Sequence, residues 1–370
     1  MTRLRMVLLL ARPAVIWLLV MFTATGLAQA GRPEDAFLLG RALVIVIAFL
    51  LSSVAWNDLA DEPIDRVNLP GQRPLTTGAA TRGEFVALSV GSAVIALGVS
   101  ATLGWPVLAV TCCGLAVSAG YSLRPVRLAG RGAVASLALP ACYVATPYLI
   151  GVLSARRGLS GADLGLASGL YLGFIGRILL KDFRDVRGDA LFGKRTFLVR
   201  HGRVPTCTFS AMCWAAGTGV ILLASHHRTL LLIATETACL AGALTILRAL
   251  ATDGGPRRDE ALISASAIIG RGMILLLLAH LSMTAARWPQ LGHTAVLALL
   301  FLATAGQAAG MAWHGPASRL TVPAWLGEAD TDPGLARRDG TATPAQAAAV
   351  AVSMTVSTDP ATLPGRRVPG

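Results

Sequence analysis

Ten long apolar runs, separated by short polar stretches, restrict how this chain can fold. A helix needs about 20 residues to cross the roughly 30 Å hydrocarbon core of a bilayer. Hydrophobic residues make up 54% of the chain, charged residues only 14%, and the mean hydropathy is +0.63, which is too apolar for a soluble domain of this length. We therefore predict an all-α, polytopic transmembrane helical bundle of nine or ten spans, at residues 7–27, 37–56, 84–103, 106–120, 133–153, 162–180, 207–224, 229–249, 261–285 and 293–313.

The two ends of the chain differ from this pattern. Arg3 and Arg5, followed by an apolar stretch and by Ala28-Gln29-Ala30, resemble a secretory signal, but Arg12-Pro13 interrupts the apolar region. We therefore expect a retained first helix. Pro, Ala, Thr, Gly, Arg and Asp dominate the last residues without a helical period. The predicted organisation is a transmembrane domain at 1–313 and a disordered tail at 314–370.

Basic residues gather in alternate loops and predict the orientation of the bundle. If the N-terminus is cytoplasmic, the opposite side carries few basic residues: Arg32, Arg156, Arg157, Arg228 and Arg287. The cytoplasmic side carries the rest of the loop charge, including Arg73, Arg127 and Lys194, as the positive-inside rule requires. We predict a multi-pass protein of the cell membrane. The net charge of +12 reflects this topology and anion binding, and no basic amphipathic face indicates nucleic acid.

Two acidic segments share one spacing of three aspartates. The second aspartate lies three residues after the first, and the third lies four residues after the second. The first segment holds Asp58, Asp61 and Asp65, and the second segment holds Asp182, Asp185 and Asp189. Steps of three and four residues return side chains to one side of a helix. Like charges about 4 Å apart repel by roughly 4 kcal/mol at an effective dielectric constant near 20, so such clusters favour a bound cation.

Both acidic segments are predicted to lie on the cytoplasmic side. The chain crosses the membrane four times between the end of the second run and the end of the sixth, and four is an even number. The loop from Tyr121 to Arg131 returns to that side too. Magnesium prefers oxygen ligands and often binds carboxylates together with substrate phosphates, while arginines bind the remaining phosphate oxygens. A molecule with a diphosphate head and an apolar tail suits such a mouth above a hydrophobic cavity.

The sixth apolar run carries a glycine every four residues, at Gly161, Gly165, Gly169 and Gly173. Such a ridge of small residues allows two membrane helices to approach closely. We interpret it as a packing surface and not as part of a catalytic site.

Three segments together resemble the UbiA superfamily of intramembrane prenyltransferases over roughly residues 10–290. Asn57-Asp58-x-x-Asp61-x-x-x-Asp65, continuing through Arg66 to Arg73-Pro74-Leu75, is similar to the first family signature. Lys181-Asp182-x-x-Asp185-x-x-Gly188-Asp189 is similar to the second, and Tyr121-Ser122 with Arg124 and Arg127 resembles the basic loop between them.

The resemblance implies a helical bundle around a lipid-accessible cavity, with Mg²⁺ at its cytoplasmic end. It implies transfer of a prenyl group from an allylic prenyl diphosphate to a small-molecule or lipid acceptor, often an aromatic ring. Asp61, Asp65, Asp185 and Asp189 would be catalytic. Asn57, Asp61 and Asp65 would bind one metal and Asp185 and Asp189 a second, with Asp58 and Asp182 in support. The candidate substrate-binding residues are Arg12, Arg66, Arg73, Tyr121, Ser122, Arg124, Arg127 and Lys181.

Two alternatives to transfer remain open at this point. A cyclase of the same superfamily would ionise the diphosphate with the same motifs and let the chain's own double bond capture the cation. A transporter would instead use acids within the membrane, of which Glu236 is the clear example. Pro63, inside the first motif, removes a backbone donor, so we expect a kinked helix and carboxylates divided between its end and a loop.

Overall fold

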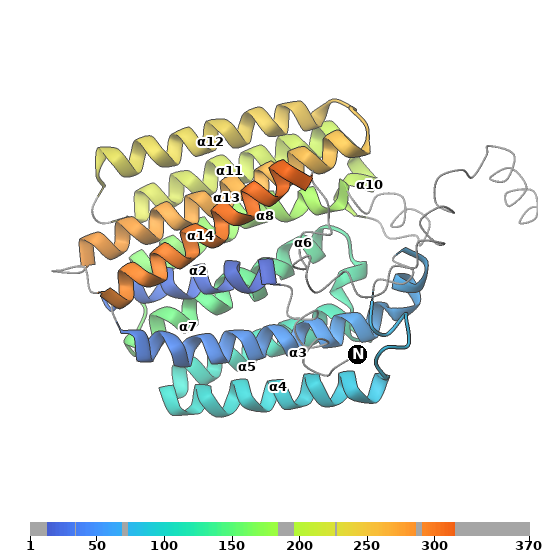
Figure 1. Ribbon diagram of the computed structural model, residues 1–370, viewed down its shortest axis with the longest axis horizontal. Helices are drawn as coiled ribbons and strands as arrows, with labels where there is room; N and C mark the ends of the chain where they lie inside the picture. Colours follow the sequence, from blue (N-terminus) through green and yellow to red (C-terminus); the bar gives the residue numbers. More distant parts are fainter. Residues whose placement is uncertain are drawn as a thin grey trace, which may run out of the picture. The chain divides into compact units, whose positions relative to one another are not determined.

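The computed structural model describes residues 13–33, 35–68, 73–183, 196–225, 228–285 and 291–314. Within them the chain is helical and contains no strand (Figure 1). The helices are α2 (Pro13–Gln29), α3 (Ala36–Asn68), α4 (Arg82–Leu103), α5 (Trp105–Ser122), η1 (Leu128–Gly130), α6 (Ala133–Pro140), η2 (Ala141–Ala145), α7 (Thr146–Ala155), α8 (Gly161–Ile178), η3 (Leu179–Lys181), α10 (Phe197–His201), α11 (Arg203–Ala224), α12 (Leu230–Ala251), α13 (Pro256–Ala285) and α14 (Leu291–His314).

Every predicted apolar run corresponds to a helix or to consecutive helical segments. Eight helical stretches among the described residues are long and apolar enough to cross a membrane, and two shorter apolar stretches lie at 14–29 and 297–310. The predicted all-α membrane bundle is therefore confirmed. The fifth run differs in detail, because a single wider π-helical turn, η2, follows Pro140 and joins α6 to α7.

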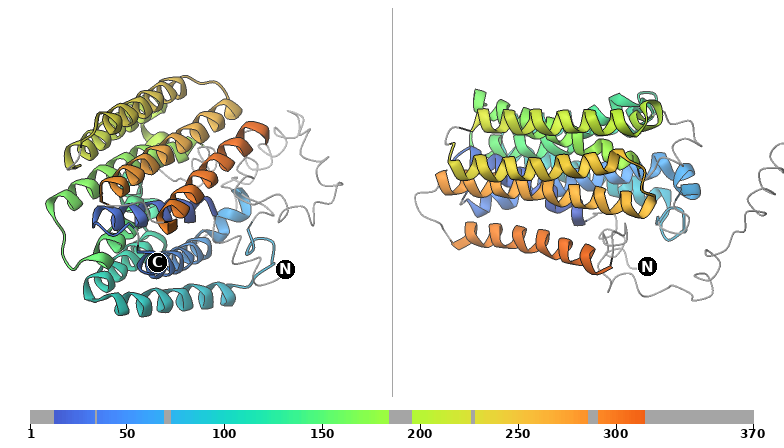
Figure 2. Two further views of the ribbon diagram at one scale, coloured as in Figure 1. Left: turned by 60° about the vertical axis from the view of Figure 1, so that its left-hand side comes forward. Right: turned by 90° about the horizontal axis from the view of Figure 1, so that it is seen from above.

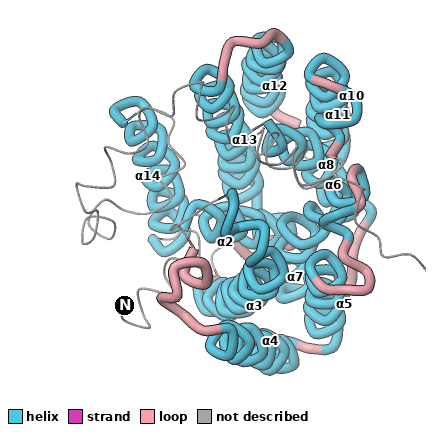
Figure 3. The backbone as a smooth tube through the Cα atoms, turned by 90° about the vertical axis from the view of Figure 1, so that its right-hand side faces the viewer, coloured by secondary structure: helices cyan, strands magenta, loops and turns pink. Residues whose placement is uncertain are grey.

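Helix α2 lies in the middle of the bundle. It contacts α3 and α7 on one side and α13 on the other, as the view along the helices shows (Figure 3). Leu19, Met21 and Phe22 of α2 and Tyr148 of α7 are almost completely buried. Among the other contacts, α3 packs against α4 and α8 against α11, while α12 lies beside α11 and α13 (Figure 2).

Glycines bring two of these helix pairs into close contact. A Cβ at Gly169 of α8 would come within 2.9 Å of the Gly217 carbonyl oxygen of α11, and one at Gly217 within 2.6 Å of the Gly173 backbone nitrogen. A Cβ at Gly165 would meet Ala224, whereas one at Gly161 would meet nothing within 4 Å. The predicted glycine ridge therefore packs against α11, but not at its first position. Gly26 of α2 approaches α7 in the same way.

Candidate active site

The whole first acidic motif lies on one helix. The expected division of the carboxylates between a helix end and a loop is wrong, because α3 continues through Pro63 to Asn68. Arg73 gives the physical reason: its guanidinium group lies 3.6 Å from carboxylate oxygens of both Asp58 and Asp65, which flank Pro63. These ion pairs connect the two halves of the helix end across the missing hydrogen bond. Asn57 lies one helical turn before Asp61, and its side-chain amide donates to the Asp61 carboxylate at 3.0 Å.

The loop after α5 supplies a second arginine to this motif. The Arg127 guanidinium donates to a carboxylate oxygen of Asp61 at 3.1 Å. Arg127 has a left-handed backbone, with φ of 34°, and its N–H donates to the Leu123 carbonyl at 2.8 Å. A left-handed backbone at a non-glycine residue costs energy and is retained where the surrounding structure requires it. The loop thus directs this guanidinium group at the acidic motif.

The other predicted residues of this loop have different surroundings. Ser122 is buried at the end of α5, whereas Arg124 is exposed. Tyr121, half-buried, lies within electrostatic range of both Asp61 and Asp182. The first motif, the end of α5 and the start of the second motif therefore meet at one end of the bundle, as the parity of the crossings predicts.

Glu62, which lies between the aspartates of the first motif, binds two arginines. Its buried carboxylate accepts from Arg66 at 2.9 Å and also pairs with Arg82 at the start of α4. Arg66, a predicted substrate-binding residue, is thus paired along its own helix. The interaction between Glu62 and Arg82 ties α3 to α4.

The second motif is described only at its beginning. Lys181 ends η3 and is exposed, Asp182 is half-buried, and Phe183 is buried. Asp185, Asp189 and, at the other end of the chain, Arg12 lie outside the described residues.

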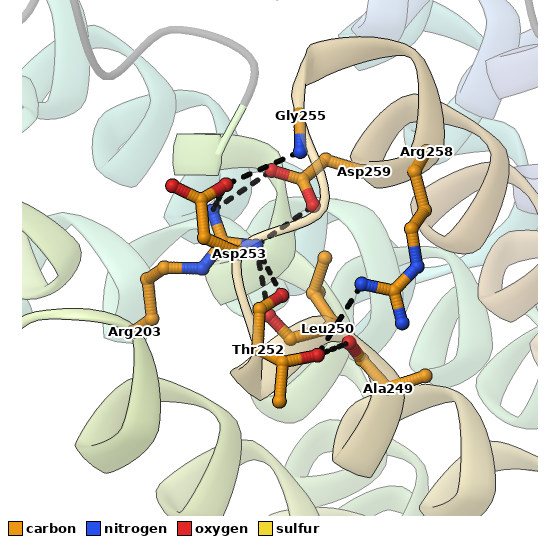
Figure 4. Close-up of polar contacts among 8 residues, drawn as sticks. All are labelled: Arg203, Ala249, Leu250, Thr252, Asp253, Gly255, Arg258 and Asp259. Carbon is orange, nitrogen blue, oxygen red and sulfur yellow. Dashed lines mark hydrogen bonds and ion pairs between the residues drawn. The ribbon is translucent and has the colours of Figure 1, made fainter.

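An arginine network holds the segment next to the second motif, and sequence analysis missed it. The Arg203 guanidinium lies 5.0 Å from the ring centre of Phe183. It donates to both carboxylate oxygens of Asp259, at 2.8 and 2.7 Å, and to the backbone carbonyls of Leu250 and Thr252 (Figure 4). Arg203 thereby joins α11 to the end of α12, to the loop that follows it and to the start of α13. Its partners lie 47 to 56 residues away and belong to no motif, so no local signal could have revealed them.

The donor chemistry of the motif end fits Mg²⁺ with a diphosphate. Among the described residues, no three His, Cys, Asp or Glu side chains lie close enough together to hold a metal ion. Magnesium, however, usually binds through one or two carboxylates and completes its shell with water and phosphate oxygens. Asn57, Asp61 and Asp65 offer such oxygens at four-residue steps, and Arg73 and Arg127 place cations beside them.

A largely apolar cavity lies between α2, α8, α11, α12 and α13. It measures about 500 Å³ with its opening included. Phe22, Leu170, Phe174 and Met273 are among the side chains that line it. Two ionisable residues line it as well, Arg177 in the last turn of α8 and Glu236 of α12.

Comparison with known proteins identifies the class of this membrane bundle. The sequence model of the UbiA prenyltransferase family matches residues 18–265. The chain belongs to this family, and it is a multi-pass membrane prenyltransferase. The predicted resemblance is confirmed.

Individual relatives agree with this assignment. The 34 kDa chain of bacteriochlorophyll synthase from Chloroflexus aurantiacus is 27% identical over 63% of this chain and 74% of its own length. Digeranylgeranylglyceryl phosphate synthase from Methanoculleus marisnigri is 34% identical over 49% of this chain and 63% of its own.

Solved structures share the fold. A structure of digeranylgeranylglyceryl phosphate synthase aligns with a TM-score of 0.62 at 17% identity, over 76% of this chain and 100% of that chain. A UbiA homologue from Archaeoglobus fulgidus, solved with DMAPP and Mg²⁺, aligns with a TM-score of 0.58 at 16% identity, over 75% of this chain and 99% of that chain.

Proposed function

We propose that this enzyme transfers a prenyl group from an allylic prenyl diphosphate to an aromatic or lipid acceptor, with Mg²⁺, at the cytoplasmic face of the cell membrane. The observation that carries the proposal is the meeting of two arginines from separate loops, Arg73 and Arg127, with the carboxylates of one acidic motif. Carboxylates bind Mg²⁺ and arginines bind phosphate oxygens, so the two together suit a complex of Mg²⁺ with diphosphate better than Mg²⁺ or diphosphate alone. The A. fulgidus homologue bound to DMAPP and Mg²⁺ supports the same chemistry.

The predicted residues then have defined roles. Asn57, Asp61 and Asp65 would hold one Mg²⁺ and Asp185 and Asp189 a second, with Asp58 and Asp182 in support. Bound there, Mg²⁺ would neutralise the charge that develops on the leaving diphosphate. Arg73, Arg127 and Lys181 bind the remaining phosphate oxygens, together with Arg12, Arg66 and Arg124. Tyr121 and Ser122 border the same end of the bundle.

The reaction follows from these charges. The arginines stabilise the diphosphate as the allylic carbon–oxygen bond breaks, and the diphosphate takes the bonding electrons. The surrounding bundle excludes water from the allylic cation. The acceptor then forms a bond to the cationic carbon and releases a proton.

Product analysis with the purified protein in lipid nanodiscs tests the proposal. Geranyl, farnesyl and geranylgeranyl diphosphates are each supplied with a panel of phenols and lipid alcohols, and diphosphate release is measured beside mass spectrometry of the lipids. We expect a prenylated acceptor, loss of activity with EDTA, and recovery with added Mg²⁺. A cyclic hydrocarbon formed without acceptor would identify a cyclase instead. Turnover in metal-free buffer would contradict the proposed site.

A further inference from the structure

Glu236 is a buried acid without the partner that the other buried acids have. It is 1% exposed, and neither carboxylate oxygen has a hydrogen-bond partner among the described residues. Asp163, which is also buried, pairs with Arg156 and accepts from the Ser160 N–H. Buried carboxylates without such partners are costly and rare, above all within a membrane span. A site with an unsatisfied acid therefore indicates a ligand.

Trp214 supplies a second unsatisfied polar group on the same cavity. Its indole N–H is buried and has no hydrogen-bond partner in the described part of the chain. The ring occupies a slot between α8 and α13, because a Cβ at Gly176 would come within 2.6 Å of it and one at Gly270 within 3.2 Å. Trp214 and Glu236 both line the cavity between α2, α8, α11, α12 and α13. Trp214 of α11 thus offers a hydrogen-bond donor to the cavity, and Glu236 of α12 offers acceptors.

The charge of the cavity selects the class of ligand. Arg177 lines the same cavity, and its positive charge repels a cationic ligand there. A neutral ligand is then favoured over a cationic one. A hydroxyl group can donate to the Glu236 carboxylate and accept from the Trp214 indole, and the other lining residues are mostly apolar.

The position of Glu236 along the bundle separates it from the acidic motifs. Glu236 is the seventh residue of α12, about 9 Å along the helix axis from its first residue. Arg177, in the last turn of α8, is four residues before Lys181. Helices α8 and α12 both begin at the end of the bundle opposite the motifs. No described residue of the acidic motifs lines this cavity, so Glu236 belongs to a site distinct from the carboxylates of the motifs.

We propose that Glu236 and Trp214 form a recognition site for the neutral hydroxyl group of an apolar alcohol or phenol, in a cavity whose described lining includes no residue of the acidic motifs. This site goes beyond the proposed function and does not depend on it, because binding requires neither a metal nor turnover. A single hydrogen bond predicts about a tenfold preference for a hydroxylated ligand over its ether.

Photolabelling with two matched probes tests the site. The protein in nanodiscs is irradiated with 4-hydroxybenzophenone or with 4-methoxybenzophenone, and labelled peptides are identified by mass spectrometry. We expect saturable labelling of residues that line the cavity, such as Met273 and Leu277. The concentration that gives half-maximal labelling should be about tenfold lower for the hydroxyl probe than for the methoxy probe. Equal labelling by both probes would overturn the proposal.

Variants assign the preference to the two residues. Glu236→Leu and Trp214→Phe should each remove the difference between the probes, and Glu236→Gln, which keeps size and hydrogen bonding, should retain part of it. Thr237→Val is the control on the same helix, because Thr237 is exposed and its hydroxyl donates to the Ile233 carbonyl at 2.7 Å. Unchanged preference for the hydroxyl probe in all three variants would contradict the assignment. A protein that keeps its preference for the hydroxyl probe but releases no diphosphate would contradict the proposed function and not this site.

Discussion

Arg127 at the acidic motif can exchange its partner at little cost to the fold. Its side chain is 30% exposed and that of Asp61 is 26% exposed, and the two make a single contact at 3.1 Å. Pairs of this kind stabilise a protein by only about 0–1 kcal/mol. The Arg127 guanidinium group is therefore available to phosphate oxygens when a diphosphate arrives, whereas Arg73, which pairs with the buried Asp58, also holds the end of α3.

The aspartates of the two motifs should act as one unit. Asp61→Asn and Asp185→Asn should each remove most of the rate, because each loses a carboxylate of the proposed metal–diphosphate complex. The double variant should be scarcely slower than either single variant, since residues with one shared task are not additive. Initial rates of diphosphate release check this, with circular dichroism as the control for folding. Losses that multiply would indicate independent roles.

Arg127 should contribute mainly to diphosphate binding. Arg127→Gln removes the guanidinium group that now contacts Asp61, so KM for the prenyl diphosphate should rise by about tenfold to a hundredfold, equivalent to one hydrogen bond to a charged group. Arg82→Gln is the control, because Arg82 is exposed and pairs with Glu62. Steady-state kinetics distinguish the two variants. An equal rise in KM for both would show that general surface charge, and not this position, binds the substrate.

At the scale of elements, the Arg203 network connects three segments near the second motif. Asp259→Asn should lower the free energy of unfolding by about 2 kcal/mol, because it weakens the paired contact with Arg203 that joins α11 to α13. Asp253→Asn should have little effect, since Asp253 is 80% exposed and lies 3.8 Å from Arg203. Unfolding in mixed detergent micelles measures both. A smaller loss for Asp259→Asn than for Asp253→Asn would contradict this description.

The contact between α8 and α11 depends on glycine at one position of α11. Gly217→Ala would place a methyl group 2.6 Å from the Gly173 backbone nitrogen, so the helices must separate and stability should fall by about 1–3 kcal/mol. Gly219→Ala, on the same helix, would meet nothing within 4 Å and should be neutral or slightly stabilising. Comparison of the two unfolding midpoints gives the result. Equal midpoints would mean that α8 and α11 adapt freely.

Elements held by local interactions can be predicted from the sequence, whereas those held by residues far apart in the sequence cannot. The apolar runs predict the helices because a bilayer forces their backbone hydrogen bonds inside each segment. The sequence does not predict, however, that α3 continues through Pro63 to Asn68, since the polar extension is held by Arg73 and by Arg82 from α4. Composition likewise predicts Glu236 as an acid in the membrane, but only the structure shows that it lines a cavity with Trp214.

For the whole molecule, the orientation of the bundle can be measured directly. In a variant without the six native cysteines, Thr77→Cys, Arg131→Cys and Lys194→Cys should react with an impermeant maleimide only from the cytoplasmic side. Leu159→Cys and Arg228→Cys should react only from outside. Labelling of right-side-out and inverted vesicles gives the assignment. Reaction of positions 77 and 194 on opposite sides would exclude a site built from both motifs.

The length of α3 places the proposed reaction at the interface between membrane and water. Its 33 residues extend about 50 Å, well beyond the roughly 30 Å hydrocarbon core, and Asn57 lies about 31 Å from its start. The motif therefore begins where the hydrocarbon ends. The proposed donor can keep its charged head in the aqueous layer and its tail in the lipid throughout the reaction. Its encounter rate then depends on its surface density in one leaflet, so dilution with inert lipid should slow turnover even when the amounts of enzyme and substrate in the sample are unchanged.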